Sequence, residues 1–132
     1  MAAIKIKKIY FASDQHFGAP NKKLSEERER HFINWLDIVE KNGSELFLLG
    51  DLFDFWFEYK KVVPKGFVRV LGKLAAITDS GIPIHYFVGN HDLWIKDYFE
   101  NELNIKTYFE PKDFTYNNVS FFIGHGDGLG PK

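Results

Sequence analysis

Short apolar runs alternate along this chain with longer stretches in which apolar residues recur at helical spacing. The runs are too short for helices and predict strands at residues 4–12, 46–49, 84–88 and 119–123. Further strands are predicted at residues 105–109 and 114–116, with a tight turn at Asn117-Asn118 that leads into the last run. The periodic stretches between the runs predict helices.

Three helices are predicted from these stretches. The first begins at Ser25 as its N-cap and ends at residues 42–43, the second starts near Pro64 and ends at residues 80–81, and the third covers residues 93–103. The buried stripes consist of Phe32, Ile33, Leu36 and Val39 in the first helix and of Phe67, Val70, Leu71, Leu74, Ala75 and Thr78 in the second. This order of elements predicts one α/β domain whose sheet is covered by helices.

Several of the predicted strands end in side chains that can bind a divalent metal. These side chains are Asp14, His16, Asp51, Asn90, His91 and His125. Ligands of an open α/β sheet bind beyond the carboxyl ends of its strands, and imidazole, carboxylate and amide groups are ligands of borderline divalent metals. For Asp51 alone, capping of the following turn is the structural alternative. The combination of clusters favours a metal site.

The composition limits what such a site can be. With 17 basic and 18 acidic residues the net charge is −1, so a nucleic acid is not expected as a partner. The chain has no cysteine, which excludes disulfides and thiolate metal sites. No signal-peptide core or membrane-length apolar run is present. We therefore expect a soluble cytoplasmic protein, with peripheral contact with the inner membrane left open.

Read in chain order, the polar clusters are Asp14-x-His16, Gly50-Asp51-x-x-Asp54, Gly89-Asn90-His91-Asp92 and Gly124-His125-Gly126-Asp127. In this order they resemble the motifs of the calcineurin-like metallophosphoesterases, and the resemblance spans nearly the whole chain. It implies that residues 1–132 are the N-terminal portion of a metallophosphoesterase domain, an αββα sandwich with outer helices that is incomplete at its C-terminus. Residues 49–56 and 124–127 are most similar to the UDP-2,3-diacylglucosamine hydrolases of lipid A synthesis.

The resemblance implies two divalent metal ions, with manganese expected first and magnesium, iron or zinc as alternatives. It assigns Asp14 and His16 to one metal, Asn90 and His125 to the second, and Asp51 to both. Two cations about 3.5 to 4 Å apart can lower the pKa of a bridging water and clamp a phosphoryl group. The shared ligand must be a carboxylate, because one imidazole nitrogen cannot serve two metals.

The resemblance also implies roles beyond metal binding. His91 would face the leaving-group oxygen as general acid or electrostatic stabiliser, with a structural hydrogen bond as the alternative. Asp54 matches the family position that orients this histidine. The predicted substrate contacts are Asn90, Phe55 and Trp56.

Other segments have two interpretations each. The aromatic and basic stretch of residues 53–61 suits an acyl chain or a sugar with its phosphate, or a membrane surface; packing beneath another part of the protein is the alternative. His31 and His85 are expected to be structural, and the mixed charges of residues 26–30 are expected to form a solvated helix face.

The sequence departs from the family patterns in three places. His91 stands where many UDP-2,3-diacylglucosamine hydrolases have arginine, which indicates a more generic or a variant subfamily. Phe55 replaces the arginine of protein Ser/Thr phosphatases, so that activity is not expected. The family's last motif, Gly-His-x-His, is absent from residues 1–132. We therefore expect a C-terminally truncated chain in which each metal has three protein ligands, with weakened metal affinity and turnover.

The main hypothesis is a binuclear metal-dependent hydrolase of a phosphate ester or pyrophosphate bond. Its partner would be a small phosphorylated substrate such as a nucleotide-linked lipid, with UDP-2,3-diacylglucosamine as the leading candidate. One alternative is a generic phosphodiesterase with another substrate. A second alternative is a catalytically inactive binding module that holds a partner through the aromatic stretch. The sequence indicates no oligomeric state.

Overall fold

A parallel sheet lies at the centre of the fold in the computed structural model, which describes residues 8–59, 62–89, 95–116 and 118–125. Its strands are β1 (Ile9–Ala12), β2 (Glu45–Leu48), β3 (Ile84–Phe87) and β4 (Lys106–Tyr108), paired in the order β1-β2-β3-β4. The helices are α1 (Lys22–Asn42), α2 (Val68–Asp79) and α3 (Tyr98–Leu103). An antiparallel hairpin follows, formed by β5 (Lys112–Tyr116) and β6 (Val119–Ile123).

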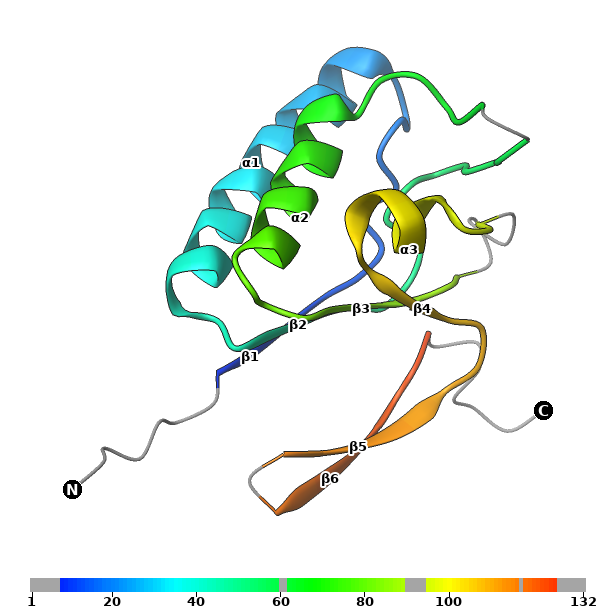
Figure 1. The fold of residues 1–132 in the computed structure, drawn as a ribbon. Helices are drawn as coiled ribbons and strands as arrows, with labels where there is room; N and C mark the ends of the chain where they lie inside the picture. Colours follow the sequence, from blue (N-terminus) through cyan, green and yellow to red (C-terminus); the bar gives the residue numbers. More distant parts are fainter. Residues whose placement is uncertain (1–7, 60–61, 90–94, 117, 126–132) are drawn as a thin grey trace.

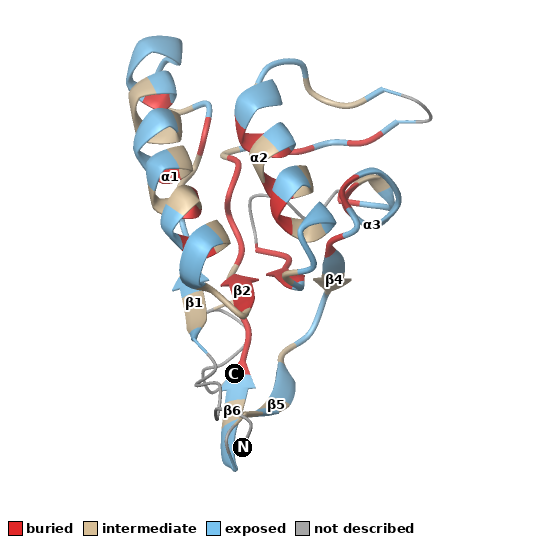
Figure 2. Cartoon of the chain, turned by 60° about the vertical axis from the view of Figure 1, so that its left-hand side comes forward, coloured by how far each residue is buried: buried red, intermediate tan, exposed pale blue. Residues whose placement is uncertain are grey.

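The helices and the hairpin cover opposite faces of the sheet (Figure 1). All residues of β2 and β3 are buried, because both strands are covered on two sides (Figure 2). Side chains of a strand alternate between faces, so Leu46 and Leu48 pack into the core under the helices while Phe47 packs into a second core under the hairpin. The predicted α/β class with helical cover is confirmed; of an αββα sandwich, the described residues contain a helical layer, the parallel sheet and the hairpin.

Helix α1 begins one turn earlier than predicted. Its N-cap is Asn21, whose Oδ1 accepts a hydrogen bond from the Leu24 amide at 3.0 Å. The predicted cap, Ser25, lies inside the helix, where its hydroxyl accepts from the Gly18 amide at 2.6 Å and donates to Glu29 at 3.0 Å. The prediction was wrong because Asn21 caps the helix, and the Ser25 hydroxyl accepts from an amide of the preceding loop rather than from an amide at the helix start.

The starts of α2 and α3 also differ from the prediction. Helix α2 begins at Val68 rather than near Pro64, because Gly66 and Phe67 have positive φ values of 94° and 60° that interrupt the helical path. Helix α3 begins at Tyr98, and residues 93–94 of the predicted helix lie outside the described residues. The Tyr98 amide donates to the carboxylate of Glu58 at 3.0 Å. This contact between distant segments leaves no local signal in the sequence.

The strand boundaries shift by a few residues. Strand β4 is shorter than the predicted residues 105–109, and β5 begins two residues before the predicted residues 114–116. Asn118 has a φ of 65°, as expected in a tight hairpin turn, whereas its neighbour Asn117 lies outside the described residues. Among the described residues, no helix has the length and apolarity needed to cross a membrane.

Glu58 offers a test of how the core is held together. Its buried carboxylate accepts from the Trp56 indole at 2.8 Å and from the Tyr98 amide, so Glu58→Ala would leave two donors without that partner. We expect the free energy of unfolding to fall by about 2 to 4 kcal/mol, measured by urea denaturation. The control is Glu102→Ala at an exposed position of α3, with an expected change within about 0.5 kcal/mol. Equal effects of the two substitutions would contradict this role for Glu58.

Candidate metal centre

The loops that follow β1 and β2 run side by side beyond the ends of the strands. The Asp14 amide donates to the Gly50 carbonyl at 3.1 Å. Two residues later, the His16 amide donates to the Asp51 carbonyl at 2.9 Å. These hydrogen bonds continue the parallel pairing of the strands into the loops. Polar residues that are distant in the sequence are thereby brought together at the carboxyl edge of the sheet.

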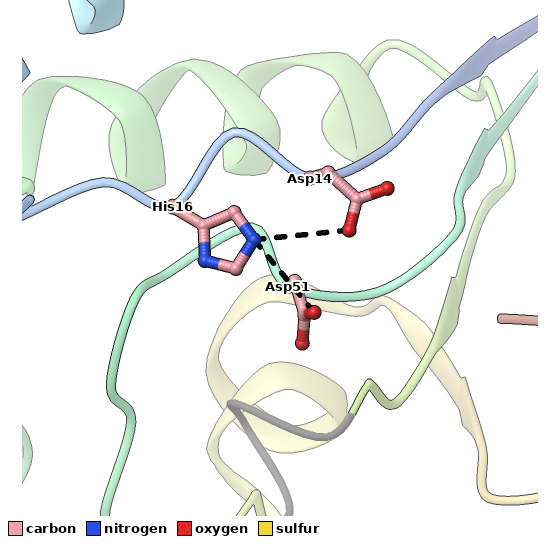
Figure 3. A group of neighbouring side chains, drawn as sticks. All are labelled: Asp14, His16 and Asp51. Atoms are coloured by element: carbon pink, nitrogen blue, oxygen red, sulfur yellow. Dashed lines mark ion pairs between the residues drawn. The ribbon is translucent and has the colours of Figure 1, made fainter. Parts of the chain in front are cut away.

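Asp14, His16 and Asp51 form a compact group of potential ligands (Figure 3). His16 Nε2 lies 3.8 Å from Asp14 Oδ1 and 3.8 Å from Asp51 Oδ2. One ligand atom from each of the three residues lies within 4.8 Å of the others. His125 approaches from beyond β6, with its Nε2 3.5 Å from the same Asp51 Oδ2. The Asp51 carboxylate therefore lies within 3.8 Å of two imidazoles that come from different parts of the chain.

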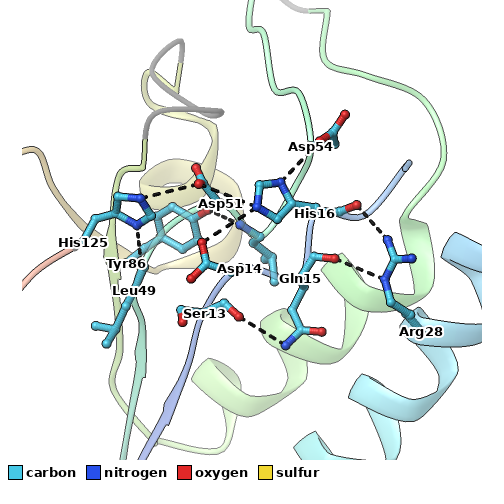
Figure 4. Close-up of polar contacts among 11 residues, drawn as sticks. Ser13, Asp14, Gln15, His16, Arg28, Leu49, Asp51, Asp54, Tyr86 and His125 are labelled. Atoms are coloured by element: carbon cyan, nitrogen blue, oxygen red, sulfur yellow. Dashed lines mark hydrogen bonds and ion pairs between the residues drawn. The ribbon is translucent and has the colours of Figure 1, made fainter. Parts of the chain in front are cut away.

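Both histidines are held in the tautomer that suits a metal ligand (Figure 4). His125 Nδ1 lies 2.7 Å from the Leu49 carbonyl, which can only accept, so Nδ1 carries the proton. His16 Nδ1 lies 3.3 Å from Asp54 Oδ1 and donates to it in the same way. In the neutral imidazole this leaves a lone pair on Nε2, the atom that faces Asp51 in each case.

The backbone of the site is strained at its ligands. Asp14, His16 and Asp51 have φ values of 57°, 49° and 53°, in the left-handed region that few residues other than glycine adopt. Each such residue costs about 1 to 3 kcal/mol and persists only where its surroundings hold it. Strain of this kind concentrates at functional sites, and here it lies at the three residues of the compact ligand group.

Two glycines make room for the ligands. A Cβ added to Gly89 would lie 2.8 Å from Cγ of Asp51, which is closer than real Cβ contacts allow. A Cβ added to Gly50 would lie 2.5 Å from His125 Nδ1, and Gly50 also has a φ of 90°. The close approach of backbone and ligand at both positions requires glycine.

Arg28 of α1 holds the Asp14 loop from outside, a role that sequence reasoning missed (Figure 4). Its guanidinium donates to the carbonyls of Gln15 at 3.2 Å and His16 at 2.8 Å, and also to that of Ala19. The prediction of a solvated face for residues 26–30 is therefore wrong at Arg28, which is half-buried against the loop. The fork geometry of arginine suits several carbonyls at once, but the charge pattern alone gives no sign of them.

The remaining predicted site residues have different placements. Asn90 and His91 lie outside the described residues, so their roles stay predictions. Asp54 contacts His16, and its predicted action on His91 stays a prediction as well. Phe55 is 62% exposed, and its role as a substrate contact stays a prediction. Trp56 is fully buried, with its indole hydrogen-bonded to Glu58, so this part of the prediction is corrected: the ring belongs to the core and offers no surface to a substrate.

The donor set fits a divalent cation. The described donors are carboxylate oxygens and imidazole nitrogens, which suit manganese, magnesium, iron and zinc better than softer metals. Asp51 is 3% exposed, so its charge is poorly solvated and would be compensated by bound cations. The site can thus hold cations and present them to an anionic substrate at the sheet edge.

Comparison with known proteins agrees with this geometry. The family model described as calcineurin-like phosphoesterase matches residues 7–129. A UDP-2,3-diacylglucosamine hydrolase from Porphyromonas gingivalis is 40% identical over 120 residues, which cover 91% of this chain and 46% of the relative. One from Hahella chejuensis is 30% identical over 119 residues, covering 90% of this chain and 47% of the relative. The chain spans about half the length of these curated relatives.

A solved structure supports the fold. A protein of unknown function from Aquifex aeolicus superposes with a TM-score of 0.58 and 20% sequence identity. The match covers 91% of this chain and 61% of that protein. At this identity the likeness concerns the fold alone.

Gly89→Ala tests the space that Asp51 needs. The added methyl group would displace the carboxylate, so we expect Mn²⁺ affinity to fall by about 10- to 100-fold, measured by isothermal titration calorimetry. The matched control is Gly72→Ala in α2, where an added Cβ meets no atom within 4 Å. That variant should bind Mn²⁺ as the unsubstituted protein does, and its free energy of unfolding should be about 0.5 to 1 kcal/mol higher. Unchanged Mn²⁺ binding by the Gly89 variant would contradict the claim that a methyl group at this position displaces the Asp51 carboxylate.

Arg28→Ala tests the clamp on the Asp14 loop. Loss of the guanidinium removes hydrogen bonds to carbonyls of the loop that carries two ligands, so Mn²⁺ affinity should fall by about tenfold. Arg30→Ala, at an exposed position of the same helix, serves as the control for lost positive charge. If both variants lose Mn²⁺ affinity equally, the effect is electrostatic, and the proposed role of the Arg28 hydrogen bonds to the loop is refuted.

Proposed function

Because the chain belongs to the calcineurin-like phosphoesterase family, we propose that it hydrolyses a phosphate ester or pyrophosphate bond with two divalent cations. The observation that carries this proposal is the Asp51 carboxylate. Its Oδ2 lies 3.8 Å from His16 Nε2 and 3.5 Å from His125 Nε2, between ligands that approach from different loops. Because the two imidazoles come from different loops, each can serve a different cation, with the Asp51 carboxylate as the shared ligand.

Each residue then has a defined task. Asp14 and His16 hold the first cation, His125 and Asn90 hold the second, and Asp51 holds both. When bound, the cations supply Lewis-acid stabilisation of phosphoryl charge and lower the pKa of water. The backbone pairing of the two loops keeps these donors in place before substrate arrives, so little reorganisation is needed on binding.

Two further residues act on protons and orientation. We assign to His91 the protonation or stabilisation of the leaving-group oxygen. We assign to Asp54 the orientation of His91; its Oδ1 also lies 3.3 Å from His16 Nδ1, which supports an orienting task at a metal ligand as well. Because these two roles belong to different side chains, separate substitutions of His91 and Asp54 can distinguish them.

For the substrate, we propose a nucleotide diphosphate linked to an acylated sugar, cleaved at the pyrophosphate. This rests on the relatives named UDP-2,3-diacylglucosamine hydrolase. The exposed ring of Phe55, one residue after Asp54, offers an apolar contact next to the site. We propose manganese as the metal and the cytoplasm as the location, where a lipid-linked substrate would bring the protein to the inner-membrane surface.

Asp51→Asn tests the proposal. An amide is a weaker bridging ligand than a carboxylate, so Mn²⁺-dependent hydrolysis of UDP-2,3-diacylglucosamine should fall by more than about a hundredfold, the upper end for residues that only support a ligand. Phosphorus NMR of the nucleotide product measures the rate. The control is Asp79→Asn, an exposed carboxylate at the end of α2 and at the opposite edge of the sheet, which should leave the rate unchanged.

The substrates used distinguish the alternatives. Cleavage of an aryl phosphodiester without cleavage of the nucleotide lipid would favour a generic phosphodiesterase. Retained turnover in Asp51→Asn would refute the two-cation proposal. Failure of the unsubstituted protein to cleave either compound with Mn²⁺ would favour a binding module.

A further inference from the structure

A group of buried polar side chains lies on the hairpin side of the sheet, at the end of β2 opposite the candidate metal centre. Glu45 of β2 and His85 of β3 are 7% and 5% exposed. His85 Nε2 lies 2.7 Å from Glu45 Oε2, and the Tyr116 hydroxyl of β5 donates to the same oxygen at 2.7 Å. The Tyr108 hydroxyl of β4 lies 2.9 Å from His85 Nδ1. One carboxylate thus joins the sheet to the hairpin.

The protons of this group can be assigned. Burial lowers the pKa of His85, against the opposing effect of Glu45, so the imidazole is neutral near pH 7 and donates from one nitrogen. Because the Glu45 carboxylate accepts, His85 donates from Nε2, and its Nδ1 accepts from the Tyr108 hydroxyl. Burial, together with the hydrogen bond to Glu45, raises the pKa of Tyr116, which therefore stays a donor.

Glu45, His85 and Tyr108 are hydrogen-bonded in series, in the same order as the acid, base and nucleophile of a catalytic triad. A nucleophile needs a lowered pKa or a base that removes its proton. Burial instead raises the pKa of the Tyr108 hydroxyl, with the charge of Glu45 acting in the same direction. The arrangement favours a structural role over covalent catalysis.

The hairpin is held at both ends of β2. At the amino end, Tyr116 donates to Glu45. At the carboxyl end, His125, two residues after β6, donates from Nδ1 to the carbonyl of Leu49, one residue after β2. Between these points the ring of Phe47 packs against Phe114, with 5.0 Å between centroids. Apolar packing has little directional preference, so the hydrogen bonds set where the hairpin sits along the strand.

We propose that Glu45 and Tyr116 are positioning residues for His125 and thereby set the affinity of the second cation site. The inference rests on the proposed two-cation function. The hydrogen bond at the amino end of β2 fixes the hairpin, the hairpin fixes the backbone at residue 125, and the Leu49 carbonyl fixes the ring. His16 and Asp14 lie on the loop after β1, so the hydrogen bond between Tyr116 and Glu45 acts on His125 and not on these two ligands of the first cation.

Tyr116→Phe is the main test, because it keeps the ring and removes only the hydroxyl. Mn²⁺ titrations followed by electron paramagnetic resonance and calorimetry should show the second equivalent bound about tenfold more weakly, with the first unchanged. Thr115→Val, on the exposed face of the same hairpin, is the matched control and should leave both equivalents unchanged. Equal weakening of both equivalents, or of neither, would overturn the proposal.

A second measurement needs no metal. In the metal-free protein, NMR should show faster exchange of the His125 Nδ1 proton in Tyr116→Phe than in the unsubstituted protein or in Thr115→Val. Glu45→Gln, which keeps the shape of the anchor, should give the same change to a smaller extent and replaces Tyr116→Phe if that variant does not fold. Unchanged exchange in the folded variants overturns the proposal. Binding of fewer than two Mn²⁺ by the unsubstituted protein refutes the two-cation function instead, and the exchange data then decide the positioning role.

Discussion

The backbone pairing between the loops after β1 and β2 is the constraint on which the candidate centre depends. Amides of Asp14 and His16 donate to carbonyls of Gly50 and Asp51, so the loops cannot separate without losing these bonds. The pairing also supports the left-handed backbone of the ligands, which is costly for residues with a Cβ. Hydrogen bonds of the main chain thus set the positions of the two carboxylates, and the side chains supply the metal-binding atoms.

The side chains around the buried carboxylate of Asp51 favour the binding of cations. A carboxylate this buried is unfavourable unless cations or donors compensate it. Two imidazoles lie 3.5 and 3.8 Å from its Oδ2, and their Nδ1 atoms face other acceptors, Leu49 O and Asp54 Oδ1. The arrangement therefore favours cation binding, because each histidine directs its Nε2 toward the same carboxylate oxygen.

Local patterns in the sequence account for the strands, the helical faces and the convergence of Asp14, His16 and Asp51. Each apolar run ends at a polar cluster, and parallel strands deliver their ends to one edge. What could not be predicted depends on contacts between distant segments. Arg28 donates to loop carbonyls, and the carboxylate of Glu58 accepts from the first amide of α3 and from the indole of the buried Trp56. None of these contacts changes the periodicity that a sequence shows.

Successive side chains of β2 face two different cores, and this limits the insertions and deletions that the strand can accept. Its even-numbered residues face the helices, its odd-numbered residues face the hairpin, and Asp51 follows three residues after its end. Insertion or deletion of one residue would exchange the two faces and turn Glu45 toward an apolar interior. Loops elsewhere in the chain can absorb such a change. This strand cannot, because a shift in its register would alter both cores and the metal ligands together.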